Sequence, residues 1–360
     1  LLTKRKGTNT MDFQFFTQDL GIDLGTANVL IYADGQGVVI REPSVVAVDK
    51  NSGKILQVGA AARNMLGRTP GNVVAMRPLK DGVVCDHELT VKMLQTMFRS
   101  ITKSTIFSPK PRVVISVPSG ITEVEERTVI NAAAEAGARR VYLIEEPLAA
   151  ALGAGLDLNS PTGHMVVDIG AGTTDIAVLS MNGVATSSSL KVAGDAFDEA
   201  IARYVRRKHG VIIGQTTAED VKIQIGSVYP RNDDPTMVIK GRDSKNGIPR
   251  ELMLSSSEIC EVLNRMGRQI ADEVISVLED TSPELVGDIA HTGIVLTGGG
   301  SQIYGMDMLL TERTGVRCTL ADDAASCVVY GCGKSLAWIN TMTEGPINVA
   351  KKRLLSSRVR

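Results

Sequence analysis

Short apolar runs alternate with longer amphipathic stretches along most of the chain. Four runs have the length of a buried strand and end at glycine, proline or glutamate: residues 112–118, 140–146, 164–170 and 293–300. Residues 122–137 predict a helix, because Thr122 and Glu125 have capping-box spacing and alanines fill the middle. A second helix is expected within residues 256–282, which start in serines and stop ahead of a proline. Strands that alternate with helices predict an α/β architecture.

Two segments interrupt this pattern. Residues 229–256 are polar and rich in turn residues, with short alternating runs that are typical of a small β-containing subdomain. A similar insertion is expected at about residues 48–80. The simplest arrangement is therefore two halves, each carrying one insertion.

One pattern occurs twice. The stretch "GIDLGTANVLIYADGQG" starts at Gly21, and "VDIGAGTTDIAVLSMNG" starts at Val167. Each copy predicts an apolar strand, an aspartate, a turn rich in glycine and threonine, and a second apolar strand. Asp23 and Asp168 lie about one domain length apart, which indicates a duplication. The repeat alone leaves open whether the two hairpins are only a structural echo or serve one ligand.

The composition of both turns favours phosphate binding. The first turn offers backbone N–H groups beside the side chains of Thr26 and Asn28. In the second turn the same donors come from Gly170, Ala171, Gly172 and Thr173. Two such turns facing each other across a cleft would grip a nucleoside triphosphate. Asp23 and Asp168 would hold Mg²⁺ beside it, largely through water.

A third glycine-rich turn, residues 298–301, follows an apolar strand and would bring backbone close to a nucleotide. Glycine-rich strand ends are common, but three such turns, each after a strand, together favour a nucleotide site. Competing motifs fail, since "GCGKS" (331–335) lacks the first glycine of a P-loop and the chain contains no HExxH and no G-x-S-x-G.

Hydrolysis of a triphosphate needs a group that orients the attacking water. Glu145 and Glu146 end the apolar run of residues 140–146 and precede an alanine-rich helix. One carboxylate would then lie at the carboxyl end of a strand, where α/β ligand sites form. Alternatively, both glutamates only favour the start of the following helix. The residues alone leave both interpretations open.

Composition excludes two classes of protein. Lys and Arg number 39 against 40 for Asp and Glu, so no overall positive field attracts a nucleic acid, and no nucleic-acid partner is expected. No run of about 18 apolar residues is present, so no transmembrane helix is expected.

Several motifs together resemble the actin superfamily, specifically the bacterial actins of the MreB and Mbl type. They are "GIDLGTAN", "EEPLAAALGAG", "VVDIGAGTTDIAVLS", "TAEDVK" and "VLTGGG", and the likeness runs from about Asp19 to about Ile339. The resemblance implies an actin-like fold, in which two duplicated ribonuclease-H-like large subdomains each carry a small inserted subdomain. ATP would bind in the cleft between the two halves.

The implied boundaries follow the two insertions. The first large subdomain would comprise residues 19–47, 81–160 and 328–351, with a small subdomain at 48–80. The second would comprise residues 161–196 and 261–327, with a small subdomain at 197–260. Residues 1–18 would form a disordered N-terminal tail, and residues 352–360 a C-terminal tail.

The resemblance also implies roles for individual residues. Thr26, Ala27 and Asn28 would form the first phosphate loop, and Gly170, Ala171 and Gly172 the second. The ribose and base would face Glu219, Asp220, Val221 and Lys222, and the nucleoside would be covered by Gly298, Gly299, Gly300 and Ser301. Glu146 would orient the hydrolytic water, and Thr173 would support the γ-phosphate region.

One residue departs from the family pattern. The second phosphate loop of these proteins usually reads "GGGTT", whereas this chain has Ala171 in place of the middle glycine. If that position needs a positive φ, alanine costs on the order of 1 kcal/mol there and phosphate contact changes mildly.

The function implied by the resemblance is that of an ATP-dependent, filament-forming cytoskeletal protein. It would lie in the cytoplasm on the inner face of the bacterial membrane, direct cell-wall elongation and maintain cell shape. ATP hydrolysis would be a slow switch coupled to polymerisation. Its partners would be further copies of itself, the membrane surface and the cell-wall elongation machinery.

The family also implies a membrane-facing surface. In residues 103–112 the apolar pair Ile106 and Phe107 is flanked by Lys103, Lys110 and Arg112, a combination that suits shallow insertion beside anionic headgroups. The alternative is that both side chains pack into their own domain.

Four other functions stay open for a chain of this superfamily. Plasmid-segregation and division actins are the nearer alternatives, although "GRTPGN" and "RPLKDGVV" favour the MreB and Mbl branch. A DnaK-type chaperone would need a peptide-binding domain, for which the chain leaves no room. A small-molecule kinase would need a substrate pocket with a catalytic base, and the insertions suggest none.

Overall fold

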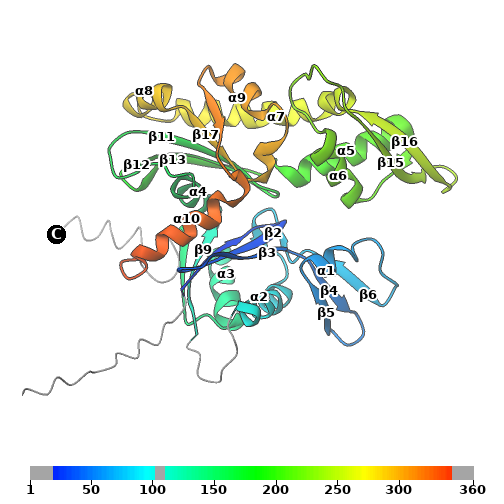
Figure 1. The fold of residues 1–360 in the computed structure, drawn as a ribbon, viewed down its shortest axis with the longest axis horizontal. Coiled ribbons are helices and arrows are strands. Elements are labelled where there is room, and N and C mark those ends of the chain that lie inside the picture. The colour runs from blue at the N-terminus through cyan, green and yellow to red at the C-terminus, as the bar shows by residue number, and fades with distance from the viewer. Residues whose placement is uncertain (1–18, 102–109, 343–360) are drawn as a thin grey trace, which may run out of the picture.

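The computed structural model describes residues 19–101 and 110–342, which fold around two five-stranded sheets (Figure 1). The first sheet has the order β10-β9-β1-β2-β3. Strand β1 (Leu20–Leu24) pairs antiparallel with β2 (Asn28–Ala33) and parallel with β9 (Arg112–Val117). The outer strands are β3 (Gly37–Pro43) and β10 (Arg140–Glu145).

The second sheet repeats this topology in the order β13-β12-β11-β17-β18. Strand β11 (His164–Ile169) pairs antiparallel with β12 (Thr174–Ser180) and parallel with β17 (Ile294–Thr297). The outer strands are β13 (Gly183–Leu190) and β18 (Cys318–Leu320). Each half is therefore an antiparallel meander extended by two parallel strands, which confirms the duplication expected from the two hairpins.

Two helices lie between the sheets and join them (Figure 1). They are α4 (Glu146–Gly153) and α10 (Cys327–Ser335). One apolar cluster contains residues of both helices together with Val114 of the first sheet and Val166 of the second. Because apolar side chains pack densely, this shared core sets how the carboxyl ends of β1 and β11 face each other.

The remaining large helices cover the outer faces of the sheets. The first sheet packs against α2 (His87–Ile101) and α3 (Glu123–Ala136). The second packs against α5 (Gly194–His209), α7 (Ser256–Glu279) and α9 (Met306–Thr314), with α8 (Pro283–Thr292) at its end.

The predicted helix starts are confirmed. The Thr122 N–H donates to Glu125 Oε2 at 2.8 Å and Thr122 Oγ1 accepts from the Glu125 N–H at 3.3 Å, which is the reciprocal capping box. Helix α7 starts at the predicted serines and ends at Glu279, ahead of Pro283.

Each half also carries a small β module, and both modules lie at the same end of the molecule (Figure 1). The first contains β4 (Val46–Asp49), β5 (Ile55–Val58), β6 (Val73–Met76) and α1 (Ala60–Arg63), followed by the hairpin β7 (Leu79–Lys80) and β8 (Val83–Val84). The second contains β14 (Val211–Ile212), β15 (Thr236–Asp243), β16 (Pro249–Ser255) and α6 (Gln215–Ile225). Both expected insertions therefore contain strands.

Three predictions concern residues outside the described ranges. The apolar pair Ile106 and Phe107 lies there, as do the two tails. Within the described ranges, no helix combines the length and the apolar character that crossing a bilayer requires.

Candidate functional site

The two glycine-rich turns border one cleft. The turn from β1 to β2 contributes residues 25–28, and the turn from β11 to β12 contributes residues 170–173. Asp23, Glu146 and Asp168 line the same cleft, whose volume is about 450 Å³. This volume lies within the range of roughly 300–1,000 Å³ that is typical of ligand pockets. The duplicated hairpins thus present their turns to a common space.

The hairpin of β7 and β8 brings the two turns into close contact. The Gly82 N–H donates to Thr26 Oγ1 at 3.0 Å. A Cβ atom at Gly172 would lie 2.6 Å from Thr26 Oγ1 and 2.8 Å from Asp81 Cα. Position 172 therefore requires glycine because its neighbours leave no room for a side chain.

The turn after β17 packs directly on the second phosphate-loop candidate. Thr297 Oγ1 donates to Asp168 Oδ1 at 2.6 Å. Gly298 has a φ of 82°, and a Cβ there would lie 2.3 Å from the carbonyl oxygen of Ile169. Gly298, Gly299 and Gly300 line the cleft, whereas the buried Ser301 donates its hydroxyl to the Gly298 carbonyl at 2.6 Å.

Buried carboxyl groups form the floor of the cleft. Burial, followed by the charge of Asp168, raises the pKa of Asp23 to about 7, although the nearby hydroxyl of Ser116 opposes the shift. Asp23 keeps part of its surface open to the cleft. Burial also raises the pKa of Asp168 to about 7, although the Thr297 hydrogen bond opposes the shift.

Glu146 belongs to the same group. Burial raises the pKa of Glu146 well above its ordinary value, and the charges of Asp175, Asp23 and Asp168 raise it further. Asp175 is itself fully buried, and its Oδ1 accepts from the Ser119 N–H at 3.0 Å. Negative charge is therefore unfavourable at this floor unless a cation accompanies it.

These residues fit a divalent cation. A cation would remove the repulsion between Asp23 and Asp168 and favour their ionised forms. Mg²⁺ keeps most of its water and needs only one or two carboxylates beside the phosphates. Asp23 and Asp168 line the same cleft as the glycine-rich turns and would supply these two groups.

The sequence matches the family model described as MreB/Mbl protein over residues 17–344. The chain belongs to the MreB/Mbl family. It is 49% identical over 327 residues to the cell shape-determining protein Mbl of Bacillus cereus (strain ATCC 10987 / NRS 248), which covers 91% of this chain and 98% of that protein. It is also 49% identical over 329 residues to the cell shape-determining protein MreB of Escherichia coli (strain K12), with coverage of 90% and 95%.

Solved structures agree with the family. MreB5 of Spiroplasma citri bound to ADP superposes with a TM-score of 0.86 at 40% identity, covering 90% of this chain and 98% of that one. The MamK double helical filament superposes with a TM-score of 0.76 at 22% identity, covering 89% and 98%, and shows the shared fold alone. The actin-like fold expected from the motifs is confirmed.

Ala171, which replaces the usual glycine of the second phosphate loop, causes no backbone strain. The non-glycine residues with positive φ in the described part of the chain are Asp81, Met181, Asn182 and Asp323. Ala171 is not among them, and its carbonyl oxygen accepts from the Asp195 N–H at 2.8 Å. The cost considered for a left-handed alanine therefore does not arise, because alanine adopts this conformation freely.

The family motif "TAEDVK" presents only part of itself to the cleft. Glu219 and Lys222 line the cleft, because residues three apart share a helix face. Val221 is fully buried in the core of the second half, and Asp220 does not line the cleft. Lys222 Nζ donates to the Gly194 carbonyl at 3.0 Å and lies 2.9 Å from Asp198 Oδ1, close enough for an ion pair but not aligned as a hydrogen bond.

Several residues that line the cleft were not predicted as site residues. They are Gly82, Gly194, Asp195, Arg231, Gln302 and Tyr304. Asp195 had a weak signal, since an acidic residue in the first turn of a helix is common. The others lie in segments whose partners are distant in the sequence, so no local pattern marked them.

Two of the ion pairs that join the first half to the second involve acidic residues of the cleft. Arg77 Nη1 donates to Asp195 Oδ1 at 2.7 Å, and Arg63 Nη2 donates to Glu219 Oε2 at 2.8 Å. Both acidic partners line the cleft, so its walls are connected to α1 and to the segment after β6.

With Mg²⁺ and nucleotide removed, we expect Asp168→Asn to raise the free energy of unfolding, and more so at pH 8 than at pH 5. Folding raises the pKa of Asp168 from 3.8 to about 7, so the folded wild type favours the protonated form. The free energy of unfolding of the wild type therefore falls as pH rises from 3.8 to about 7. Asparagine carries no charge, so the variant lacks this pH-dependent loss. The gain in the free energy of unfolding is expected to be on the order of 2 kcal/mol larger at pH 8 than at pH 5.

Urea denaturation in EDTA at both pH values measures this difference. Asp34→Asn in the exposed turn after β2 is the matched control. An Asp168→Asn gain that is the same at pH 5 and pH 8 would show that burial does not disfavour the charge of Asp168.

Proposed function

We propose that this protein is an ATP-dependent, filament-forming cytoskeletal protein that directs cell-wall elongation and maintains cell shape. The observation that carries the proposal is the duplicated hairpin whose two turns, with their buried aspartates, border one cleft. Relatives that are 49% identical are named cell shape-determining proteins, and MreB5 of Spiroplasma citri has been crystallised with ADP and with AMPPNP. The cleft of this chain would hold ATP in the same place.

In this proposal the residues of the cleft have three different roles. The turn residues Thr26, Ala27 and Asn28, with Gly170, Ala171 and Gly172 opposite, would bind the phosphates. Mg²⁺, held by Asp23 and Asp168, would neutralise phosphate charge. Glu146 would orient the attacking water, with Thr173 beside the γ-phosphate.

Glu146 is suited to this role by its position. It is the first residue of α4, directly after β10, and it is 9% exposed, so it reaches the cleft while packed protein fixes its place. Asp23, Asp168 and Asp175 are its charged neighbours. A buried carboxyl group of this kind can hold a single water molecule where bulk solvent would hold it in many orientations.

Nucleotide state would act on the filament through the cleft. ATP would contact turns from both halves and so favour the closed arrangement, in which the two sheets present the surface that binds the next subunit. Hydrolysis would be slow and would change filament affinity rather than supply metabolic turnover. The four-subdomain division at residues 48–80 and 197–260 belongs to the same proposal.

The proposed location is the cytoplasmic face of the cell membrane. The pair Ile106 and Phe107, with basic residues on both sides in the sequence, would insert shallowly among anionic headgroups. The cell-wall elongation machinery would be the partner on the same membrane.

Sedimentation tests this function. With ATP and Mg²⁺ the protein is expected to pellet, and without nucleotide it is expected to stay in the supernatant. Anionic liposomes are expected to bring it to the lipid fraction. The double variant Ile106→Ser, Phe107→Ser is expected to lose liposome binding while still pelleting with ATP. Failure to pellet under every condition would refute the filament function, and unchanged liposome binding by the variant would refute the membrane role of the loop.

A further inference from the structure

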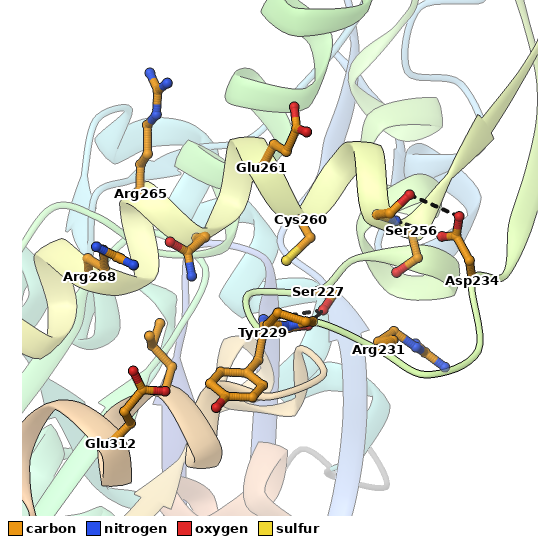
Figure 2. A pocket seen from close by; sticks show the side chains of 14 residues that line it. Ser227, Tyr229, Arg231, Asp234, Ser256, Cys260, Glu261, Arg265, Arg268 and Glu312 are labelled. Carbon is orange, nitrogen blue, oxygen red and sulfur yellow. Dashed lines mark hydrogen bonds between the residues drawn. The ribbon is translucent and has the colours of Figure 1, made fainter.

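Arg231 lines two hollows at once. One is the candidate nucleotide cleft, and the other is a second cavity of about 800 Å³. The second cavity lies between α7, the loop from α6 to β15, and α9 (Figure 2). Figure 2 shows Arg231 on the loop beneath α7, between Tyr229 and Asp234 along the chain. Arg231 therefore belongs to the wall that separates the two spaces.

The loop that carries Arg231 is held at both ends. The Val228 N–H donates to the Tyr304 carbonyl at 3.0 Å, and Asn264 Nδ2 donates to the Val228 carbonyl at 2.7 Å. At the other end the Ser257 N–H and hydroxyl donate to the carboxylate of Asp234 at 2.7 and 2.9 Å. These contacts tie the loop to the segment after β17 and to the start of α7, so the backbone of Arg231 is fixed on two sides.

The guanidinium of Arg231 is fixed as well. Its central carbon lies 4.3 Å from the centre of the Tyr304 ring, a distance that suits a cation–π contact. Nε and Nη2 donate to the two carboxylate oxygens of Asp233 at 3.1 and 2.9 Å. The bidentate pair holds the guanidinium plane in one orientation and leaves three of its N–H donors unused by Asp233.

Because the second cavity borders Arg231, few contacts hold its side chain in place. Because open space lies on one side of Arg231, the stack on Tyr304 and the pair with Asp233 set the position of the side chain. Asp233 is 70% exposed, so water competes for the pair, whereas the Arg231 side chain is only 20% exposed. Loss of either contact would let the guanidinium turn away from the cleft.

Arg231 lies on the part of the cleft wall that suits a base. Its companions there include Ile223, Ile303 and Tyr304, whose side chains are apolar or aromatic. The turns rich in N–H donors and the paired aspartates come instead from the ends of β1 and β11, where phosphates and a cation fit. A planar base stacks favourably on aromatic rings and on guanidinium planes.

We propose that Arg231 is a positioning residue for the base of the bound nucleotide. Its guanidinium lies over the Tyr304 ring and offers its outer face for stacking with the base, and its remaining N–H donors face acceptor atoms of the base or ribose. The inference rests on the proposed nucleotide function and goes beyond it, because it assigns the base-side contact to a residue that no motif of the sequence marks. Lysine cannot replace it, since an ammonium group has no plane to stack.

The test compares a ligand that has a base with one that lacks it. Arg231→Ala is expected to weaken ADP binding about 3- to 30-fold, the size of a cation–π and stacking contact, and to leave the binding of inorganic tripolyphosphate within about twofold. Arg231→Lys is expected to lose ADP affinity to a similar degree. Arg203→Ala, which removes an exposed arginine paired with Glu199 on α5, is the matched control. Titration calorimetry in Mg²⁺ measures both ligands.

Each outcome decides the inference. Equal losses of ADP and tripolyphosphate affinity would overturn it, because Arg231 would then act on the phosphates or on the fold. Unchanged ADP affinity in Arg231→Ala would overturn it while leaving nucleotide binding intact. If the wild type itself does not bind ADP, the proposed function falls together with the inference. Full retention of ADP affinity by Arg231→Lys would show that charge, not the stacked plane, is what Arg231 supplies, and would also overturn it.

Discussion

Glu146→Gln is expected to slow ATP hydrolysis by about 100-fold or more and to change ADP affinity by less than about threefold. The glutamine keeps the size of the side chain and one acceptor oxygen at the start of α4, but an NH₂ group replaces the second oxygen, so it cannot hold the attacking water in the same orientation. Positioned groups of this kind contribute about 10²- to 10⁴-fold to rate. Because hydrolysis would promote filament disassembly, filaments that the variant forms with ATP are expected to persist longer in sedimentation time courses.

Glu145→Gln is the matched control for this variant. Glu145 has the same chemistry one residue earlier but does not line the cleft. Phosphate release from both variants under saturating ATP makes the comparison. If Glu146→Gln hydrolyses ATP as fast as Glu145→Gln, Glu146 does not orient the water and its burial serves only the fold.

Gly298→Ala is expected to lower the free energy of unfolding by about 3 kcal/mol and ADP affinity by at least about tenfold. Alanine in the left-handed region costs about 1–2 kcal/mol, and the added Cβ would lie 2.3 Å from the Ile169 carbonyl oxygen, so the backbone must move. The turn after β17 and the turn after β11 would separate, and the cleft wall would open.

Gly299→Ala serves as the control for this change. Gly299 is the next residue of the same turn and lines the same cleft, but a Cβ there meets no atom within 4 Å and its φ is not positive. Urea denaturation and ADP titration compare the two variants. Equal stabilities would mean that the turn relaxes without cost and that Gly298 is not needed for close packing.

Much of the fold could be predicted from local patterns. Strands β9, β10, β11 and β17 occupy the four apolar runs, because strands buried on both faces need apolar side chains at every position. The start of α3 was predictable because a capping box involves residues only three apart. The duplication was visible because each hairpin is a local unit that repeats its own turn residues.

The candidate site was predictable only where its residues form such local units. The turns at residues 25–28 and 170–173 and the glycines at 298–300 were found, since each turn brings its N–H donors together within a few residues. Val221 packs in the core of the second half while Lys222 lines the cleft, because neighbouring residues of a motif point to different faces of a helix. Whether Ala171 strains the backbone depends on its φ angle, and a sequence does not give that angle.

Four apolar strands, two helices, the repeated hairpin and the family could be predicted from the sequence, because each depends on residues that are neighbours along the chain or on motifs of a few positions. Contacts between side chains that are far apart in the sequence became visible only in the folded protein. The apolar packing of α4 and α10 between the sheets places the two turns on one cleft, and contacts between segments far apart in the sequence pair Arg63 with Glu219 and Arg231 with Tyr304. Such contacts follow from how whole elements pack, and no local spacing records them.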